Sequence, residues 1–150
     1  MKVCEEFYIN GEWVKPVNDL KTLDVINPAT EEVFGRIALG DKDDVDAAVE
    51  AAYNAFESFG YSSVDERVSL LEKILEVYQG KYDEIAETIS SEMGAPIGLS
   101  KAAQAATGLG HFSTALETLK NYKFEEVKGS ALIRKEPIGV VGMITPWNWP

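Results

Sequence analysis

Cysteine and histidine are nearly absent from this sequence. Cys4 and His111 are each the only residue of their type among 150 residues. A single thiol cannot form an internal disulfide, which fits a reducing compartment, and one thiol with one imidazole cannot build a Cys/His metal centre. We therefore predict no metal site. Cys4 has only Lys2 as a basic neighbour, so we interpret it as a free surface thiol, and we interpret His111 as a structural or surface residue.

Positive charge and long apolar runs are also scarce. The 14 Lys and Arg residues are outnumbered by 25 Asp and Glu residues, which gives a formal net charge of −11. Such a surface repels phosphate backbones, so we expect no nucleic-acid partner. No apolar run approaches the ~20 residues that a membrane-spanning helix needs, and the opening Met-Lys-Val-Cys-Glu-Glu lacks the apolar stretch of a signal peptide. We therefore expect a cytoplasmic protein without a membrane partner.

The residues that are present describe an ordinary globular domain whose first forty positions favour strands. Hydrophobic residues make up 45% of the chain and charged residues 26%. Asn10-Gly11 lies between the β-prone residues 7–9 and 13–14, and this dipeptide predicts a hairpin because both residues tolerate positive φ. Residues 22–26 and 33–39 are predicted as two further strands.

The central part of the chain carries four helical patterns, in which apolar residues recur at the spacing of a one-sided helix. Asp41 is a suitable N-cap for the first helix. Ser63 and Glu66 form a capping box for the second, and Gly80 separates the second from the third. The fourth pattern covers residues 100–121. Its Gly108-Leu109-Gly110 lacks the third glycine and the preceding strand of a dinucleotide fingerprint, so we interpret it as close helix packing.

After residue 121 the pattern changes to strands. Residues 122–127 and 131–135 alternate apolar and polar side chains on either side of Lys128-Gly129-Ser130, which predicts a hairpin. Residues 138–144 form a continuous apolar run, typical of a parallel strand buried on both faces. Such a strand needs neighbours reached through crossovers of about a dozen residues or more. We therefore expect the given sequence to stop where an α/β sheet begins.

Residues 136–150, EPIGVVGMITPWNWP, resemble the E-P-x-G-V-x-x-x-I-x-P-W-N-F-P segment of the aldehyde dehydrogenase superfamily. Other stretches are similar to the family in order and spacing. They are FYINGEWV at residues 7–14, NPAT at residues 27–30, DER with the following leucines from residue 65, and EMGAP at residues 92–96. The resemblance covers essentially the whole chain and about the first third of a family sequence.

Three residues depart from the family pattern. Glu31 stands where the family often has glycine, and Ala95 stands where it often has lysine. Both lie in turns outside the reaction centre, so they bear on the substrate subgroup and not on the family. Trp149 replaces the usual phenylalanine and, by the resemblance, lies near the aldehyde tunnel.

The resemblance implies an α/β fold that forms the N-terminal part of an aldehyde dehydrogenase. Residues 1–121 would belong to the cofactor-binding domain, residues 122–137 would form an oligomerisation hairpin, and residues 138–150 would begin the Rossmann-like sheet with its first parallel strand. The catalytic domain would lie outside this chain. The resemblance also implies a homo-oligomer, a dimer or a tetramer, for the full-length protein.

The activity implied by the resemblance is oxidation of an aldehyde to a carboxylic acid with NAD or NADP. In the family a cysteine thiolate attacks the aldehyde, hydride leaves the thiohemiacetal for the nicotinamide, and a glutamate-activated water hydrolyses the thioester. Both of those residues come later in a family chain. We therefore expect these 150 residues alone to be inactive. Two alternatives stay open, namely a stand-alone module that associates with full-length subunits and a purely structural domain.

The resemblance assigns site residues only near the end of the chain. Asn148 matches the family asparagine whose side-chain amide donates to the developing oxyanion. Ile144, Thr145, Pro146 and Trp147 match the segment that passes beside the nicotinamide half of the cofactor. Without the resemblance, Pro-Trp-Asn-Trp-Pro would be interpreted as a rigid aromatic turn after a strand.

Overall fold

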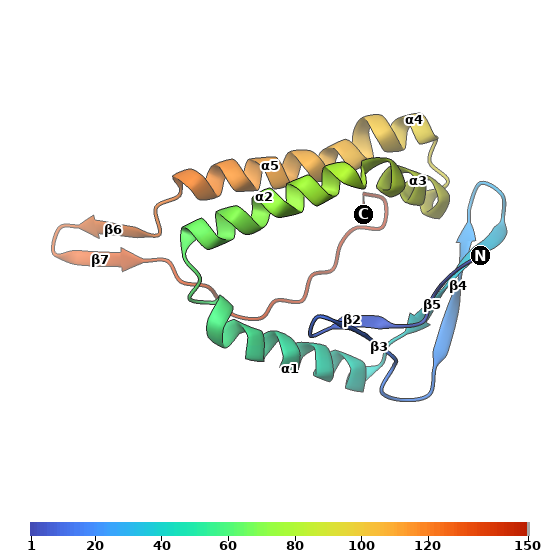
Figure 1. Ribbon diagram of the computed structural model, residues 1–150, viewed down its shortest axis with the longest axis horizontal. Coiled ribbons are helices and arrows are strands. Elements are labelled where there is room, and N and C mark those ends of the chain that lie inside the picture. Colours follow the sequence, from blue (N-terminus) through green and yellow to red (C-terminus); the bar gives the residue numbers. More distant parts are fainter. Residues whose placement is uncertain (150) are drawn as a thin grey trace.

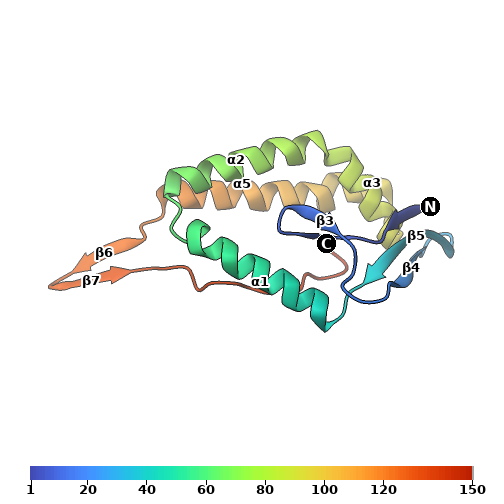
Figure 2. The ribbon, with the colours of Figure 1, turned by 60° about the horizontal axis from the view of Figure 1, so that its bottom comes forward.

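The computed structural model describes residues 1–149. Helices and short strands form an open frame. Figure 1 shows α2 and α5 side by side, α1 below them, a sheet at one end of the frame and a hairpin projecting from the other. Figure 2 shows the same pairing of α2 with α5 from a second direction. The elements in chain order are β1 (Lys2–Cys4), β2 (Phe7–Ile9), β3 (Glu12–Val14), β4 (Lys21–Asn27), β5 (Glu32–Leu39), α1 (Lys42–Phe59), α2 (Val64–Gly80), α3 (Tyr82–Met93), α4 (Ile97–Leu99), the π-helical turn η1 (Ser100–Gln104), α5 (Ala105–Asn121), β6 (Glu125–Lys128) and β7 (Ala131–Arg134).

The first hairpin forms as predicted. Strands β2 and β3 pair antiparallel, and the two residues between them, Asn10 and Gly11, have φ values of 54° and 82°. Positive φ at both positions is the conformation of a type I′ turn, which matches the natural twist of the flanking strands. The Tyr8 and Trp13 rings face each other across the strands with centroids 5.3 Å apart.

A three-stranded sheet of order β1-β5-β4 forms one end of the frame. The antiparallel pair β4–β5 confirms the two strands predicted over residues 22–26 and 33–39. The sequence analysis assigned no element to β1, which pairs parallel with β5 so that Lys2 lies opposite Gly35 and Cys4 opposite Ile37. Cys4 is exposed in this edge strand, as the surface-thiol interpretation requires.

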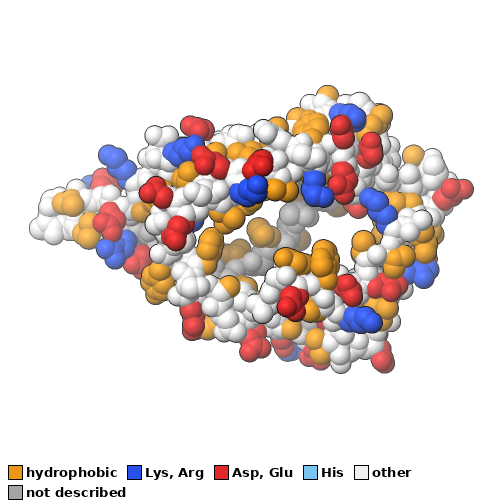
Figure 3. All heavy atoms as spheres, viewed as in Figure 1, with side chains coloured by type: hydrophobic (Ala, Val, Ile, Leu, Met, Phe, Trp, Pro, Cys, Tyr) orange, Lys and Arg blue, Asp and Glu red, His pale blue; other side chains and the backbone are white. Residues whose placement is uncertain are grey.

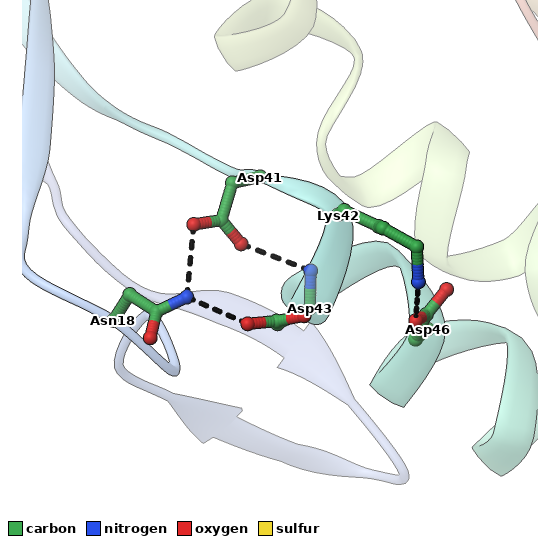
Figure 4. A network of polar contacts seen from close by, with 5 residues as sticks. All are labelled: Asn18, Asp41, Lys42, Asp43 and Asp46. Carbon is green, nitrogen blue, oxygen red and sulfur yellow. Dashed lines mark hydrogen bonds and ion pairs between the residues drawn. The ribbon is translucent and has the colours of Figure 1, made fainter.

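The start of α1 is tied to the N-terminal loop by a group of polar contacts (Figure 4). Asp41 caps the helix, as predicted, and forms a capping box with Asp44. The Asn18 side-chain amide donates to Asp41 at 3.0 Å and to Asp43 at 2.8 Å. The carboxylate of Asp44 is buried and accepts hydrogen bonds from the backbone N–H groups of Asp41 and Val17. These bonds fix the direction in which the chain enters α1.

The second and third helices also begin and end where the sequence predicts. The backbone N–H of Ser63 donates to the Glu66 carboxylate at 2.7 Å, and the Glu66 N–H donates to the Ser63 hydroxyl at 3.2 Å. The Glu66 carboxylate accepts from both the backbone N–H and the hydroxyl of Ser63, and these two bonds hold the pKa of the Glu66 carboxyl below its ordinary value. Helix α2 ends at Gly80, and α3 ends before Gly94, whose φ of 69° is the left-handed conformation of a glycine C-cap.

The fourth helical pattern contains a feature that the sequence analysis missed. The predicted helix over residues 100–121 is present, but its first five residues form the π-helical turn η1, and only then does α5 begin. Helix α5 packs on α2 where the Tyr78 ring covers Gly108. The Tyr78 hydroxyl donates to the Ala105 carbonyl at 2.9 Å, so the close-packing interpretation of this glycine segment is confirmed at Gly108.

Few large side chains are fully covered within this frame. The buried apolar residues are Ala38, Ala86, Ile89, Ala105 and Leu116. Figure 3 shows an opening between α1 and the α2–α5 layer, with apolar side chains at its edges. On α1, Val45 and Val49 are 58% and 48% exposed. No helix within residues 1–149 combines the length and apolar character needed to cross a bilayer.

The strand predicted over residues 138–144 is not formed. This segment follows an irregular path, and Ile138 and Ile144 are 93% and 100% exposed. A strand exists only when its N–H and C=O groups pair with a neighbouring strand, and none of the strands in residues 1–149 pairs with this segment. An apolar composition alone therefore does not make residues 138–144 a strand.

The contact between α2 and α5 yields a first prediction. A Cβ at Gly108 would lie 2.3 Å from the Tyr78 hydroxyl oxygen, whereas a Cβ at Gly110 has nothing within 4 Å. Gly108→Ala therefore displaces Tyr78 and should lower the free energy of unfolding by about 1–3 kcal/mol. Gly110→Ala should raise it by up to about 1 kcal/mol through helix propensity. Urea denaturation of both variants tests this, and equal shifts of the same sign would contradict it.

The turn between β4 and β5 yields a second prediction. Glu31 has a φ of 60°, which explains why glycine suits this position, and its N–H donates to the Asn27 carbonyl at 2.8 Å. Glu31→Gly should raise the free energy of unfolding by up to about 1 kcal/mol, because relief of left-handed strain exceeds the added backbone entropy. Glu32→Gly, one residue later in β5, should instead lower it by about 0.5–1 kcal/mol. A lower free energy of unfolding for Glu31→Gly would contradict the strain inferred for the Glu31 backbone.

Candidate functional site

The predicted site residues lie in the segment that leaves β7 and returns along the frame. Figures 1 and 2 show this segment passing between α1 and the α2–α5 layer. Ile144, Thr145, Pro146 and Trp147 follow one another without strand or helix, and a turn includes Trp147 and Asn148. The segment therefore presents its residues as a continuous strip and not as a pocket closed by other elements.

The strip is exposed along its length. Ile144 is 100% exposed, Trp147 is 84% exposed and Trp149 is 47% exposed. Within residues 1–149, no hydrogen bond from another element reaches Ile144, Thr145, Pro146 or Trp147. Large apolar side chains in such a position are free to pack against a ligand or another part of a protein.

One hydrogen bond ties the strip to the helices. The side-chain Nε2 of Gln104, in η1, donates to the backbone carbonyl of Asn148 at 3.2 Å. The same nitrogen lies 3.2 Å from the sulfur of Met93, and the Gln104 Oε1 accepts from the Ser100 hydroxyl at 3.1 Å. Gln104 is 6% exposed and Ser100 is completely buried. The Asn148 backbone is thus held, while its exposed side-chain amide makes no hydrogen bond within residues 1–149.

Gln104 was missed by the sequence analysis. The signal that could have found it is the pair of polar residues Ser100 and Gln104, four positions apart in an otherwise small and apolar stretch. Residues at this spacing share one face of a helix, so the positions of Ser100 and Gln104 indicate a polar pair within an apolar helical face. The link from that pair to Asn148 spans 44 positions and has no signature in the local sequence.

The other candidate side chains are not brought to the strip by any described contact. His111 is exposed on α5, where it lines a hollow of about 440 Å³ with Tyr122 and Phe124. Across residues 1–149, no three His, Cys, Asp or Glu side chains gather in a group able to hold a metal ion. The chemistry available at the strip is therefore that of an amide donor beside apolar and aromatic surface.

The second hairpin, β6–β7, is confirmed and projects from the frame (Figure 1). Its strands are exposed on both faces, with Val127 75% and Leu132 56% exposed. Phe124 packs at the base of the hairpin. Its ring lies 4.8 Å from that of Tyr122 and beneath the Arg67 guanidinium at 4.9 Å. A two-stranded hairpin with open edges is marginal alone and suits pairing with a further strand.

The sequence of this chain is similar to known proteins. A family model described as the aldehyde dehydrogenase family matches residues 13–150. A putative aldehyde dehydrogenase of Staphylococcus aureus (strain bovine RF122 / ET3-1) is 53% identical over 143 residues, which are 95% of this chain and 30% of that protein. The chain thus spans about 30% of the length of the curated relatives it matches.

Solved structures agree with the sequence comparison. An aldehyde dehydrogenase from Bartonella henselae superposes with a TM-score of 0.95 at 43% identity, covering 100% of this chain and 32% of that one. A mutant of aldehyde dehydrogenase C from Pseudomonas syringae, complexed with NAD+ and octanal, also has a TM-score of 0.95, at 41% identity, and covers 98% of this chain and 30% of that one. The expected α/β fold, matching the N-terminal part of such enzymes, is confirmed, and the chain belongs to the aldehyde dehydrogenase family.

Proposed function

We propose that this chain serves the oxidation of an aldehyde to a carboxylic acid, with NAD or NADP, as part of a full-length enzyme. The observation that carries the proposal is the exposed Asn148 amide, which makes no hydrogen bond within residues 1–149 and stands on an anchored backbone in a motif that resembles the family's. The named complex of the Pseudomonas syringae relative with NAD+ and octanal supports this chemistry. We assign residues 1–121 to the cofactor-binding domain, residues 122–137 to oligomerisation and residues 138–150 to the start of the Rossmann-like sheet.

The exposed strip suits a flat, partly apolar ligand. Ile144 and Trp147 offer uncovered apolar surface, and Pro146 restricts the backbone between them. In the proposed enzyme, Ile144, Thr145, Pro146 and Trp147 lie beside the nicotinamide half of the cofactor. When bound, that cofactor accepts the hydride that the aldehyde carbon loses. In this proposal the four residues hold and orient the nicotinamide half of the cofactor, and none of them transfers a proton.

Asn148 acts on the aldehyde oxygen in this proposal. Attack by a thiolate from a later part of the full-length enzyme places negative charge on that oxygen, and the amide N–H donates to it. The charge does not exist in the bound aldehyde, so the contact favours the transition state over the ground state. An amide is suited to the task because it is neutral and its donor is fixed before the reaction.

The third prediction tests Asn148 in the full-length enzyme. Asn148→Ala should lower kcat by roughly 10²-fold or more with little change in the KM for the cofactor, because a transition-state donor is lost. Asn148→Asp should be worse, since a carboxylate has no donor and repels the oxyanion. The backbone carbonyl that accepts from Gln104 is retained in both variants, so their melting temperatures should stay near that of the parent.

The control for this experiment is Trp149→Phe, which installs the residue usual in the family and should keep kcat within a few-fold. Steady-state kinetics and thermal melting are measured together for all three variants. A kcat within a few-fold of the parent for Asn148→Ala would remove the oxyanion role. Unfolding of both Asn148 variants would instead make the Pro-Trp-Asn-Trp-Pro segment a structural turn.

The hairpin supports a homo-oligomer, and it also fits the alternative of a stand-alone module that binds full-length subunits. The Lys135 N–H donates to the Phe124 carbonyl at 2.8 Å, which sets the alternation of bonds along the hairpin. Hydrogen-bonded and non-hydrogen-bonded pairs alternate along an antiparallel hairpin, and Phe124 with Lys135 is a hydrogen-bonded pair. The facing residues Val127 and Leu132, three positions further along, therefore form a non-hydrogen-bonded pair. Their backbone N–H groups point away from the other strand of the hairpin. Those outward groups are what a strand from a partner subunit would use.

The fourth prediction follows from these outward groups. Val127→Pro and Leu132→Pro each remove one outward N–H without removing a bond inside the hairpin. At least one of them should shift the full-length protein from a dimer or tetramer to a smaller species in light scattering. Leu132→Ala, which keeps the N–H, is the control and should leave the assembly intact. An unchanged mass for both proline variants would exclude pairing along either edge of this hairpin.

A further inference from the structure

The turn η1 is an irregular feature in an otherwise regular helical stretch. One π turn in a line of α-helix widens the backbone and weakens its hydrogen bonds, and such turns often occur at functional sites. Here the π turn carries two buried polar side chains, Ser100 and Gln104, which are 0% and 6% exposed. Between them lie Lys101, Ala102 and Ala103, and the Ser100 hydroxyl donates to the Gln104 side-chain oxygen across the turn.

The amide of Gln104 has one orientation that satisfies its surroundings. Its oxygen accepts from the Ser100 hydroxyl at 3.1 Å, and its nitrogen faces two acceptors, the sulfur of Met93 and the carbonyl of Asn148, each at 3.2 Å. Rotating the amide by half a turn would set its oxygen against both acceptors. Since the group is buried, water cannot replace a lost partner. The donor is thus aimed at Asn148 by the contacts of the Gln104 amide with Ser100 in η1 and with Met93 at the end of α3.

This bond is the polar link between the strip and the helices. Within residues 1–149, no other hydrogen bond joins Ile138 through Trp149 to the remainder of the chain. Holding the Asn148 carbonyl limits rotation of its peptide unit, and the position of its Cα and side-chain amide depends on that unit. A donor to a developing charge must be placed within a fraction of an ångström, and a displacement of about 1 Å can cost about 10²-fold in rate.

We propose that Gln104 is a positioning residue for the aldehyde oxidation, and that it sets the Asn148 side-chain amide by binding the Asn148 backbone carbonyl. The inference rests on the proposed oxyanion role of Asn148. Gln104 touches neither substrate nor cofactor in this proposal, and its whole effect on the reaction passes through Asn148. That property separates positioning from a general contribution to the packing of α3, η1 and α5.

The experiment is a double-mutant cycle in the full-length enzyme. Gln104→Met keeps an unbranched side chain of similar length but removes the amide donor. In the otherwise unchanged enzyme it should lower kcat by about 10-fold or more while leaving the KM for the cofactor within about two-fold. Combined with Asn148→Ala, it should lower kcat by no more than about two-fold further, because the group that it positions has already been removed.

Two further variants serve as a control and as a replacement in this experiment. Gln79 is the other glutamine of the chain and is exposed on α2, so Gln79→Met should leave kcat and stability unchanged. If Gln104→Met melts below the assay temperature, Gln104→Leu replaces it. That variant is apolar and has no donor for the Asn148 carbonyl. The expected pattern of kcat values is the same for either substitution.

Each outcome decides one claim. A large loss with Asn148→Ala and no loss with Gln104→Met would overturn positioning and leave the oxyanion role intact. An equal loss from Gln104→Met with and without Asn148→Ala would show a structural effect and would also overturn positioning. If Asn148→Ala itself leaves kcat unchanged, the proposed function fails at Asn148 and the inference about Gln104 fails with it.

Discussion

The Tyr78 ring occupies the place that a side chain at residue 108 would fill, and the rest of the helical layer is arranged around that contact. Gly108 permits α5 to approach α2 closely, and the Tyr78 hydroxyl binds the carbonyl of Ala105. Ala105 is the first residue after the π turn, so the same contact fixes where the widened turn ends. Through Gln104, that position reaches the carbonyl of Asn148. The spacing of α2 and α5, the π turn and the segment that contains Asn148 are therefore connected by consecutive contacts.

The features that the sequence predicts well are those decided by residues a few positions apart. The type I′ turn at Asn10-Gly11 and the caps at Asp41 and at Ser63 with Glu66 each depend on a local contact, and each is found where expected. Strand β1 escaped prediction because its partner residues lie 33 positions away, from Gly35 onward. The π turn escaped for a different reason, since an Ala-rich stretch is equally compatible with an ordinary helix.

The candidate site likewise contains one residue that the sequence could indicate and one that it could not. Asn148 could be selected only through the family motif, because an asparagine between two tryptophans has no chemical signature of its own. Gln104 could not be selected, since its importance comes from a contact across the fold. The apolar run over residues 138–144 was assigned a strand from its composition, yet strand formation also requires a hydrogen-bonding partner. This segment is largely exposed, and no strand within residues 1–149 pairs with it.

The half-buried phenol of Tyr78 links the packing of α2 and α5 to the pH of the solution. Burial raises the pKa of Tyr78 above its ordinary value near 10, because an ionised phenolate would lose its hydration between the helices. A pKa raised on folding means that the folded chain holds this proton more firmly than the unfolded chain does. The stabilisation is complete below about pH 10 and is lost as the pH rises through the folded-state pKa. Alkaline solution therefore weakens the contact between α2 and α5 at Gly108.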